Sequence, residues 1–232
     1  MPPPLSSLRH LLPFVAFALA CTGAARAADG WIALFNGKTL DGWEQRSGTA
    51  LYRVEDGAIV GQTVAKTGNT FLCTKETYGD FVLEFEFKVA DGMNSGVQFR
   101  SEFYTKDTEA EVNGKKKKFP ADRVFGYQYE IDPSPRAYTG GVYDEARRGW
   151  LVDLKSNPAA QKAFKNGAWN QARIECKGDH IQTWINGVKA ADFKDSMTLK
   201  GLIALQVHGI GDGTKRKPGE EIRWRNIRLK RL

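Results

Sequence analysis

The stretch YGDFVLEFEFKV, residues 78–89, alternates apolar and charged side chains over most of its length. Successive side chains of a β-strand point to opposite faces, so one face of this strand is apolar and the other is charged. The apolar face carries Phe81, Leu83, Phe85 and Phe87. The pattern is typical of a strand that covers a hydrophobic core on one side and meets solvent on the other.

Further strand patterns follow along most of the chain. They occur in SGVQFRSEF (95–103), GYQYEID (126–132), ARIECKGDHIQTWING (172–187), GLIALQVHG (201–209) and IRWRNIRLKRL (222–232). The KGD triplet and the pair Asn186-Gly187 mark tight hairpin turns. Many strands separated by glycine-containing turns predict an all-β sandwich or barrel, with its first and last strands close together.

Two segments depart from the strand pattern. A short helix is expected where Asn157 can cap it, Pro158 suits its first position and Gly167 ends it. The charged segment 106–122, KDTEAEVNGKKKKFPAD, is expected to form a surface loop or hairpin with its four lysines at a solvated tip.

The N-terminus resembles a secretory signal peptide. Arg9 and His10 precede the apolar run LLPFVAFALA (11–20), and the small-residue triplet ARA (25–27) follows. The apolar run is too short to span a bilayer, and no other segment is suited to span one. The sequence therefore predicts residues 1–27 as a signal peptide and export to the periplasm or the exterior.

The cysteines bear on anchoring and cross-linking. Cys21 follows ALA as in a lipoprotein signal, but Ala18 stands where such signals carry Leu, so a lipid anchor is not expected. The mature chain, residues 28–232, has a length that suits one domain. It retains Cys73 and Cys176, for which an oxidising compartment leaves a disulfide and two buried thiols as alternatives.

The charge of the chain is moderately basic. The 232 residues contain 34 Lys and Arg and 27 Asp and Glu, a formal net charge of +7. Much of this excess lies in the lysine run 115–118 and in the C-terminal segment. Because an exported protein meets little nucleic acid, we interpret the lysines as solvated and expect no nucleic-acid partner.

Three of the expected strands carry polar side chains of an unusual kind. These are Gln98, Arg100, Gln128, Glu130, Asp132, Gln206 and His208. A face that merely meets solvent would more often carry Thr, Lys and Ser. Taken singly, each residue fits an ordinary polar sheet face, and nearby Tyr138, Tyr143 and Trp150 fit core packing. Taken together, they suit recognition of sugar hydroxyl groups, and we expect the seven to line one concave face.

The stretch GYQYEIDPSP (126–135) contains part of a catalytic motif. Retaining endoglucanases of the laminarinase type, which are β-jelly rolls, carry E-x-D-x-x-E on one strand, and its two Glu residues act as nucleophile and acid/base. Here Glu130 and Asp132 match the first two acids, but Pro135 occupies the third position. Proline cannot transfer a proton, so ordinary retaining hydrolysis is not expected.

An ordered set of motifs resembles the 3-keto-disaccharide hydrolase family, also described as 3-keto-glucoside 1,2-lyase/3-keto-2-hydroxy-glucal hydratase domains. The set includes LFNGKTLDGWE, TYGDFVLEFEFKV, NSGVQFR, GYQYEID, TGGVYD, WNQARIECKGDHIQTWING, GLIALQVHG and RWRNIRLKRL, in order between residues 31 and 232. The resemblance implies a concanavalin-like jelly-roll sandwich of two antiparallel sheets, bacterial export and action on oxidised sugars.

The chemistry of that family suggests roles for the polar residues. A ketone at C3 acidifies the C2 proton, so a base can start an elimination that expels the aglycone from C1, and water can then add back. His208 or Glu130 could be the base, and Arg100 could stabilise the enolate oxygen. The expected substrate contacts are Gln98, Gln128, Asp132, Gln206, Asn94 and Tyr143. Of these, Tyr143 could face the leaving group.

Two alternatives remain open. A divalent cation held by Glu130, Asp132 and His208 could replace Arg100 as the electrophile. The protein could also be a secreted carbohydrate-binding module without catalysis, because jelly-roll faces serve lectins as well. Turnover of a 3-keto-glucoside, as opposed to binding without turnover, distinguishes the enzyme from the binding module.

Overall fold

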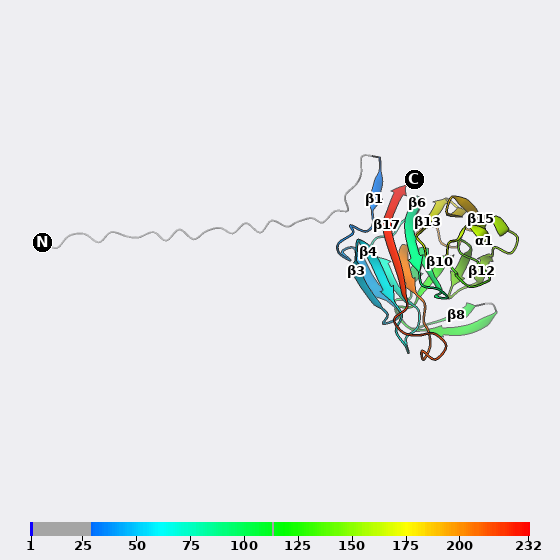
Figure 1. Ribbon diagram of the computed structural model, residues 1–232. Coiled ribbons are helices and arrows are strands. Elements are labelled where there is room, and N and C mark those ends of the chain that lie inside the picture. The colour runs from blue at the N-terminus through cyan, green and yellow to red at the C-terminus, as the bar shows by residue number, and fades with distance from the viewer. Residues whose placement is uncertain (2–28, 113) are drawn as a thin grey trace.

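The computed structural model of the protein describes residue 1, residues 29–112 and residues 114–232 (Figure 1). The expected signal peptide beyond residue 1, including Cys21, lies outside the described residues. Within the described part of the chain, no helix is long and apolar enough to cross a membrane.

The strands form two large antiparallel sheets and a separate hairpin. Sheet A has the spatial order β15 (Val188–Lys194), β14 (His180–Ile185), β13 (Asn170–Lys177), β6 (Phe81–Val89), β17 (Glu221–Arg231), β4 (Ala58–Gln62) and β3 (Leu51–Glu55), with β1 (Trp31–Ala33) also paired to β17. Sheet B has the order β12 (Gly149–Val152), β11 (Val142–Glu145), β10 (Val124–Ile131), β7 (Ser95–Phe103), β16 (Leu202–Val207), β5 (Thr70–Thr74) and β2 (Trp43–Arg46). The hairpin consists of β8 (Thr108–Val112) and β9 (Lys115–Phe119).

The sheets face each other across a hydrophobic core that takes side chains from both. Phe85 of β6 and Tyr129 of β10 meet edge to face, with ring centroids 5.6 Å apart. Trp224 of β17 is fully buried in the same core. Glu84 and Glu86 of β6 lie on the other side of sheet A, where each pairs with arginine. The alternation in residues 78–89 therefore decides which face of sheet A is inside, as expected.

The ends of the fold and its helix agree with the sequence. Trp31 in β1 pairs with Lys230 in β17, so the first and last described strands are neighbours, and Figure 1 shows blue β1 beside red β17. The described part of the chain has one α-helix, α1 (Pro158–Ala163), and Asn157 caps it by accepting a hydrogen bond from the amide of Ala160. The helix ends before Gly167 because the chain is already extended at Phe164. The all-β class with two antiparallel sheets and one short helix is confirmed.

The predicted hairpins also form. The KGD triplet joins β13 to β14, and Asn186-Gly187 joins β14 to β15. Both residues of that pair have positive φ, 48° and 82°, which matches the Asn-Gly preference of a tight hairpin turn.

The lysine run differs from the expectation. Lys115 to Lys118 do not form a loop tip but belong to β9, where they remain exposed. Tyr104 holds the base of this hairpin by stacking on Phe119 and Phe125, with centroids 5.4 and 4.4 Å apart. The aromatic stack lets the hairpin extend from sheet B (Figure 1).

The two cysteines do not form a disulfide. Cys73 and Cys176 are both free and buried. Cys73 packs beside Phe71 and Ala204 on the outer face of sheet B, whereas Cys176 lies in the core between the sheets. The thiols are thus on opposite sides of sheet B, and burial raises the pKa of each, that of Cys176 to about 12.

Candidate active site

Three neighbouring strands of sheet B, β10, β7 and β16, present glutamines to its outer face, the face turned away from sheet A. Gln128 lies opposite Gln98 on β7, and Gln206 on β16 lies opposite Gly96. The residues between them in sequence, such as Tyr129 and Leu205, point into the core. The expectation that these glutamines share one face is therefore confirmed.

Polar side chains on this face are shielded from solvent. Gln98 and Gln206 are fully buried, and Gln128 and Glu130 are exposed by only 2% and 4%. Gly96 makes this packing possible, because a Cβ at that position would lie 2.5 Å from Cδ of Gln128. The Gln128 side chain therefore lies close over the backbone of β7, which is a position that glycine allows.

Hydrogen bonds join these side chains into a network that ends on Glu130. Gln98 and Gln206 both donate to Oε1 of Gln128, over 2.6 and 2.9 Å. The amide of Gln128 donates to Oε2 of Glu130 over 2.8 Å, and Asn94, just before β7, donates to Oε1 over 2.7 Å. Each carboxylate oxygen of Glu130 thus accepts an amide hydrogen bond, which favours its ionised form.

The titration of Glu130 reflects two opposed effects. Burial raises the pKa of Glu130 to about 7, although the hydrogen bonds from Asn94 and Gln128 lower it. The charge of Asp132 adds to the increase and that of Arg136 opposes it. A carboxyl group with a pKa near 7 can both take up and return a proton at neutral pH. Glu130 therefore has the properties of a general base on this face.

Asp132 is engaged in the turn that follows β10. One carboxylate oxygen accepts from the amide of Ser134 at 3.2 Å, and the other pairs with Nε of Arg136 at 2.8 Å. Its backbone amide donates to Oγ1 of Thr139 at 2.9 Å. Asp132 thus fixes the turn and places Arg136 near Glu130, and its own oxygens are used within the turn.

The residues considered as metal ligands do not fit a cation. Glu130, Asp132 and His208 do not come together as a metal-binding group in the described part of the chain. The carboxylate oxygens of Glu130 accept amide hydrogen bonds, and those of Asp132 accept from Ser134 and Arg136. A bound cation would have to displace these partners.

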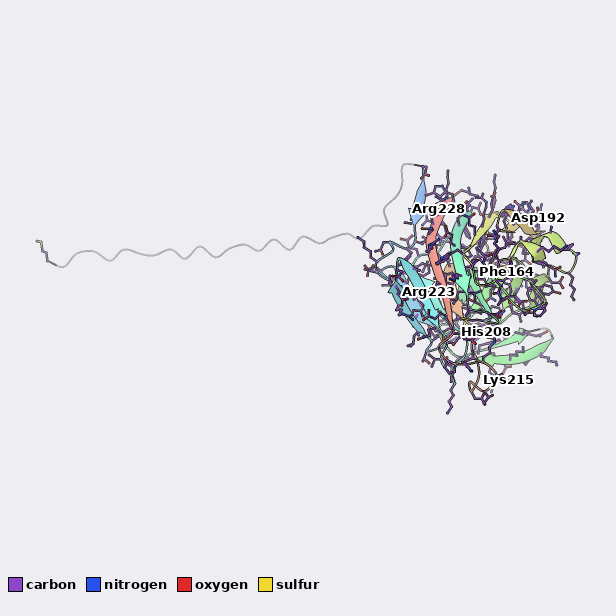
Figure 2. The ribbon with its side chains drawn as sticks, in the orientation of Figure 1. Phe164, Asp192, His208, Lys215, Arg223 and Arg228 are labelled. Carbon is purple, nitrogen blue, oxygen red and sulfur yellow. The ribbon has the colours of Figure 1, made fainter. Side chains whose placement is uncertain are left out.

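His208 lies just beyond β16, and the loop that follows it carries Lys215 (Figure 2). Its Nδ1 is 2.8 Å from the carbonyl oxygen of Gly209. A carbonyl oxygen can only accept, so Nδ1 carries the proton of the neutral ring and Nε2 keeps its lone pair. Burial lowers the pKa of His208, which makes the neutral ring the main form at pH 7.

The backbone that orients His208 is itself held in place. Oδ1 of Asn69 accepts from the amide of Gly209 at 2.9 Å. Gly209 packs closely against this neighbouring loop, because a Cβ there would lie 2.8 Å from the carbonyl oxygen of Thr67. Asn69 also donates to Glu145 over 3.2 Å. Asn69 thus connects the His208 backbone to β11.

Glu145 is a further buried carboxylate on this face, which the sequence did not indicate. It lies on β11 opposite Gly126, is 7% exposed, and pairs with Arg123. Tyr143 on the same strand lies opposite Gln128 and packs edge to face on Trp150, with centroids 5.3 Å apart. Burial raises the pKa of Tyr143, and the charges of Glu145 and Glu130 add to the increase. The only sequence signal for Glu145 is its spacing of two from Tyr143, which is common in strands.

Arg100 does not share this face, contrary to the expectation. Its φ is 44°, at a bulge where the pairing of β7 with β10 and β16 shifts register. The bulge turns the guanidinium toward the carbonyl oxygens of Gly79 and Gly178, at 2.8 and 2.7 Å, and toward Asp80 at 2.9 Å. Arg100 is fully buried and binds loops that border strands of sheet A. Its neighbour Ser101 lies on the outer face of sheet B instead, with its Oγ 2.9 Å from Oε1 of Gln98.

Two hollows of the described surface lie away from Glu130. A depression of about 890 Å³ on the outer face of sheet A is lined by residues that include Glu84, Arg173 and Trp184. A second, of about 470 Å³, is lined by Ser101, Phe103 and other residues near the Arg100 bulge. In the first hollow the carboxylates pair with arginine, as in a solvated charge ladder. The candidate active site is therefore placed at the buried polar face of sheet B, and not at the larger hollow on sheet A.

Comparison with known proteins agrees with the resemblance seen in the sequence. Residues 30–230 match the family model of the 3-keto-alpha-glucoside-1,2-lyase-like domain. The chain belongs to this family. It is similar to the 3-keto-disaccharide hydrolase of Bacteroides thetaiotaomicron, with 26% identity over 246 residues that cover 88% of this chain and 79% of the relative. The family relationship places the protein among carbohydrate hydrolases and lyases in general.

Solved structures confirm the jelly-roll fold. A protein from Parabacteroides distasonis has a TM-score of 0.55 at 20% identity and covers 88% of this chain and 95% of its own. A Bacillus subtilis protein with a galectin-like fold has a TM-score of 0.54 at 11% identity, covering 83% and 90%. The carbohydrate recognition domain of Emp47p has a TM-score of 0.51 at 14% identity, covering 88% and 96%. At these identities the likeness concerns the fold alone.

Proposed function

We propose that the protein cleaves 3-keto-glucosides by elimination across C1 and C2 and that water then adds to the product, so that the net result is hydrolysis. Buried Glu130 carries this proposal. Its carboxylate is held by two amide donors and its pKa is about 7, which suits a base that takes a proton from carbon and later returns it. Family membership supports the choice of substrate.

The proposed reaction uses the ketone at C3. Glu130 removes the C2 proton, and the electron pair forms an enolate with the C3 oxygen. When the C3 carbonyl forms again, a double bond appears between C1 and C2 and the aglycone leaves from C1. Water then adds to C1 of the resulting 2-hydroxy-3-keto-glucal, and protonated Glu130 returns a proton to C2. The sum is one water consumed and one glycosidic bond broken.

Two further side chains have chemistry that fits this sequence. Tyr143 lies beside Gln128, and its raised pKa keeps the hydroxyl protonated at neutral pH, so it can donate to the leaving oxygen. Neutral His208 presents an unprotonated Nε2, which can accept a proton from the attacking water. Exchange with solvent then removes this proton and returns one to Tyr143, so that both groups end the cycle as they began it. Arg100 has no part in this scheme, because its guanidinium is bound to loops of sheet A. We also propose export to the periplasm or exterior, on the basis of the N-terminal sequence.

The test follows the C2 hydrogen. A 3-keto-glucoside incubated with the protein in heavy water should give 3-keto-glucose labelled with deuterium at C2, and the unoxidised glucoside should be inert. Because a ketone exchanges α-protons slowly by itself, 3-keto-glucose incubated with Glu130→Gln protein is the control. Glu130 could return the same proton before it exchanges with solvent, so a substrate deuterated at C2 is compared as well. Rapid hydrolysis with hydrogen retained at C2 and no slowing of turnover by deuterium at C2 would mean direct displacement at C1. Binding without turnover would instead support a carbohydrate-binding module.

A further inference from the structure

When Glu130 is ionised and Gln98 and Gln206 both donate, the hydrogen bonds around Gln128 fix one orientation of its amide. Its Oε1 accepts from the amides of Gln98 and Gln206, at 2.6 and 2.9 Å, so its NH₂ group must face Glu130, to which it donates at 2.8 Å. If the amide rotated, its NH₂ would face two donors and its oxygen would face a carboxylate. Gln98 and Gln206 therefore determine that Gln128 presents its NH₂ group, and not its oxygen, to Glu130.

We propose that Gln98 and Gln206 are positioning residues, which hold the Gln128 amide with its NH₂ toward Glu130 and do not themselves contact the sugar. Both side chains are fully buried, and each uses an amide hydrogen on Gln128. A sugar hydroxyl could reach them only if this network opened. This assignment replaces the substrate contacts expected from the sequence, and its kinetic part rests on the proposed function.

The two glutamines are not equally held. Oε1 of Gln98 is 2.9 Å from Oγ of Ser101, whose single hydroxyl proton can also reach the carbonyl oxygens of Phe99 and Tyr127, at 3.2 and 3.1 Å. The Gln98 amide thus has a polar neighbour at each end. Oε1 of Gln206 is buried and has no hydrogen-bond partner in the described part of the chain. Gln206 is therefore oriented only by its bond to Gln128. Replacement of Gln98 should disturb the network more than replacement of Gln206.

The network acts on the ionisation of Glu130 in a defined direction. The titratable and charged groups facing Glu130 are Asp132 after β10, Arg136 in the following loop and Tyr143 on β11. On the other side of Glu130 lie the amides of Asn94 just before β7, Gln98 on β7 and Gln206 on β16, with His208 beyond the end of β16. Because Gln128 donates to the carboxylate, a mobile Gln128 would support the ionised form less well.

The test replaces each glutamine by methionine, which is of similar length but forms no comparable hydrogen bond. In Gln98→Met and Gln206→Met, the acid limb of kcat should move to higher pH, so that kcat at pH 6 falls about ten-fold for a shift of one unit while kcat at pH 9 stays within about two-fold. The KM should stay within about two-fold of wild type. Gln171→Met, at an exposed position of β13, is the matched control and should change neither parameter.

A raised KM with an unchanged pH profile would overturn the proposal, because it would assign the glutamines to substrate binding. An unchanged KM together with an unchanged profile would overturn it as well. If a methionine variant does not fold, Ser101→Ala is used instead. It removes the hydroxyl that contacts Oε1 of Gln98 with little change in volume, and it should shift the pH profile of kcat in the same direction.

A measurement without substrate separates this proposal from the proposed function. In protein labelled with ¹³C at glutamate carboxyl groups, the Glu130 signal is the one missing from Glu130→Gln. Its titration should move to higher pH in Gln98→Met even if no 3-keto-glucoside is cleaved, in which case the positioning role holds and the proposed function fails. An unmoved titration in a protein that does cleave 3-keto-glucosides would overturn the positioning role alone.

Discussion

The outer faces of the two sheets are both polar, yet they are built in different ways. On sheet A, Glu84 pairs with Arg173 and Arg228, and these three side chains are 27%, 36% and 52% exposed. On sheet B, Gln98 and Glu130 are 0% and 4% exposed, and their partners are amides. One face carries ion pairs in solvent, and the other carries amides together with the carboxylates of Glu130 and Glu145 out of solvent.

This difference has energetic consequences. Exposed ion pairs contribute about 0–1 kcal/mol each, because water already solvates both partners well. A buried polar group destabilises the fold unless each of its hydrogen bonds is satisfied, and a buried carboxylate does so even more. Sheet B keeps such groups at the centre of its outer face, where apolar residues would pack more easily. This burial supports the chemical role proposed for Glu130, whereas the exposed ion pairs of sheet A require no such role.

The largest expected effect comes from exchanging one carboxylate on each face for an amide. Glu130→Gln should lower kcat on a 3-keto-glucoside by about 10²- to 10⁴-fold, because it removes the proposed general base. Glu86→Gln, on the outer face of β6, should leave kcat within about two-fold, since Glu86 only pairs with Arg225 and Asn226. Steady-state kinetics at pH 8 compares the two. Equal losses in both variants would mean that the faces do not differ in function.

The two histidines extend the comparison with a smaller effect. His208→Ala should slow turnover by about 10²-fold, because the oriented ring on the sheet B side is proposed to activate water. His180→Ala should have little effect, since His180 lies on β14 of sheet A and pairs with exposed Asp192. If water addition is the step affected, the enone intermediate should accumulate in His208→Ala, which ultraviolet absorbance can follow. Unchanged kcat in His208→Ala would remove His208 from the scheme.

Much of this contrast was predictable from the sequence. Alternation placed Phe85 in the core and Gln128, Glu130 and Gln206 on a common face, because a period of two fixes the facing of every residue in a regular strand. Alternation does not report whether a polar face is covered. Burial of these side chains depends on packing between neighbouring strands, such as that of Gln128 over Gly96.

Arg100 and Glu145 mark the limit of that reasoning. Counting by two from Gln98 placed Arg100 on the outer face, but the bulge at φ 44° redirects it, and no glycine or proline at that position signals the bulge. Glu145 belongs to the outer face through the pairing of β11 with β10. That pairing brings together residues that no local pattern connects, so a single sequence could not reveal it.

The smallest expected effect is a difference in how stability depends on pH on the two faces. The pKa of Glu130 is raised from its ordinary value of 4.5 to about 7, so the stability linked to its proton is fully present below pH 4.5 and is lost as pH rises through about 7. For Glu86, burial acts to raise the pKa, but hydrogen bonds from Asn226 and Arg225 outweigh it and lower the pKa. The stability linked to Glu86 is therefore present above its unfolded pKa and is lost as pH falls.

Urea unfolding of wild type, Glu130→Gln and Glu86→Gln between pH 4 and pH 8.5 tests these opposite signs. The free energy of unfolding of wild type relative to Glu130→Gln should fall by about 3 kcal/mol as pH rises from 4.5 to 8, which follows from a shift of roughly 2.5 pKa units. The free energy of unfolding of wild type relative to Glu86→Gln should instead fall slightly as pH is lowered toward 4. Only the slopes are informative, because the new NH₂ group in Glu130→Gln must face one of the two donors, Asn94 or Gln128, and this lowers stability at every pH. Parallel slopes for both variants would show that Glu130 titrates as an ordinary surface carboxylate, and the distinction between a chemical and a solvated face would then fail at its central residue.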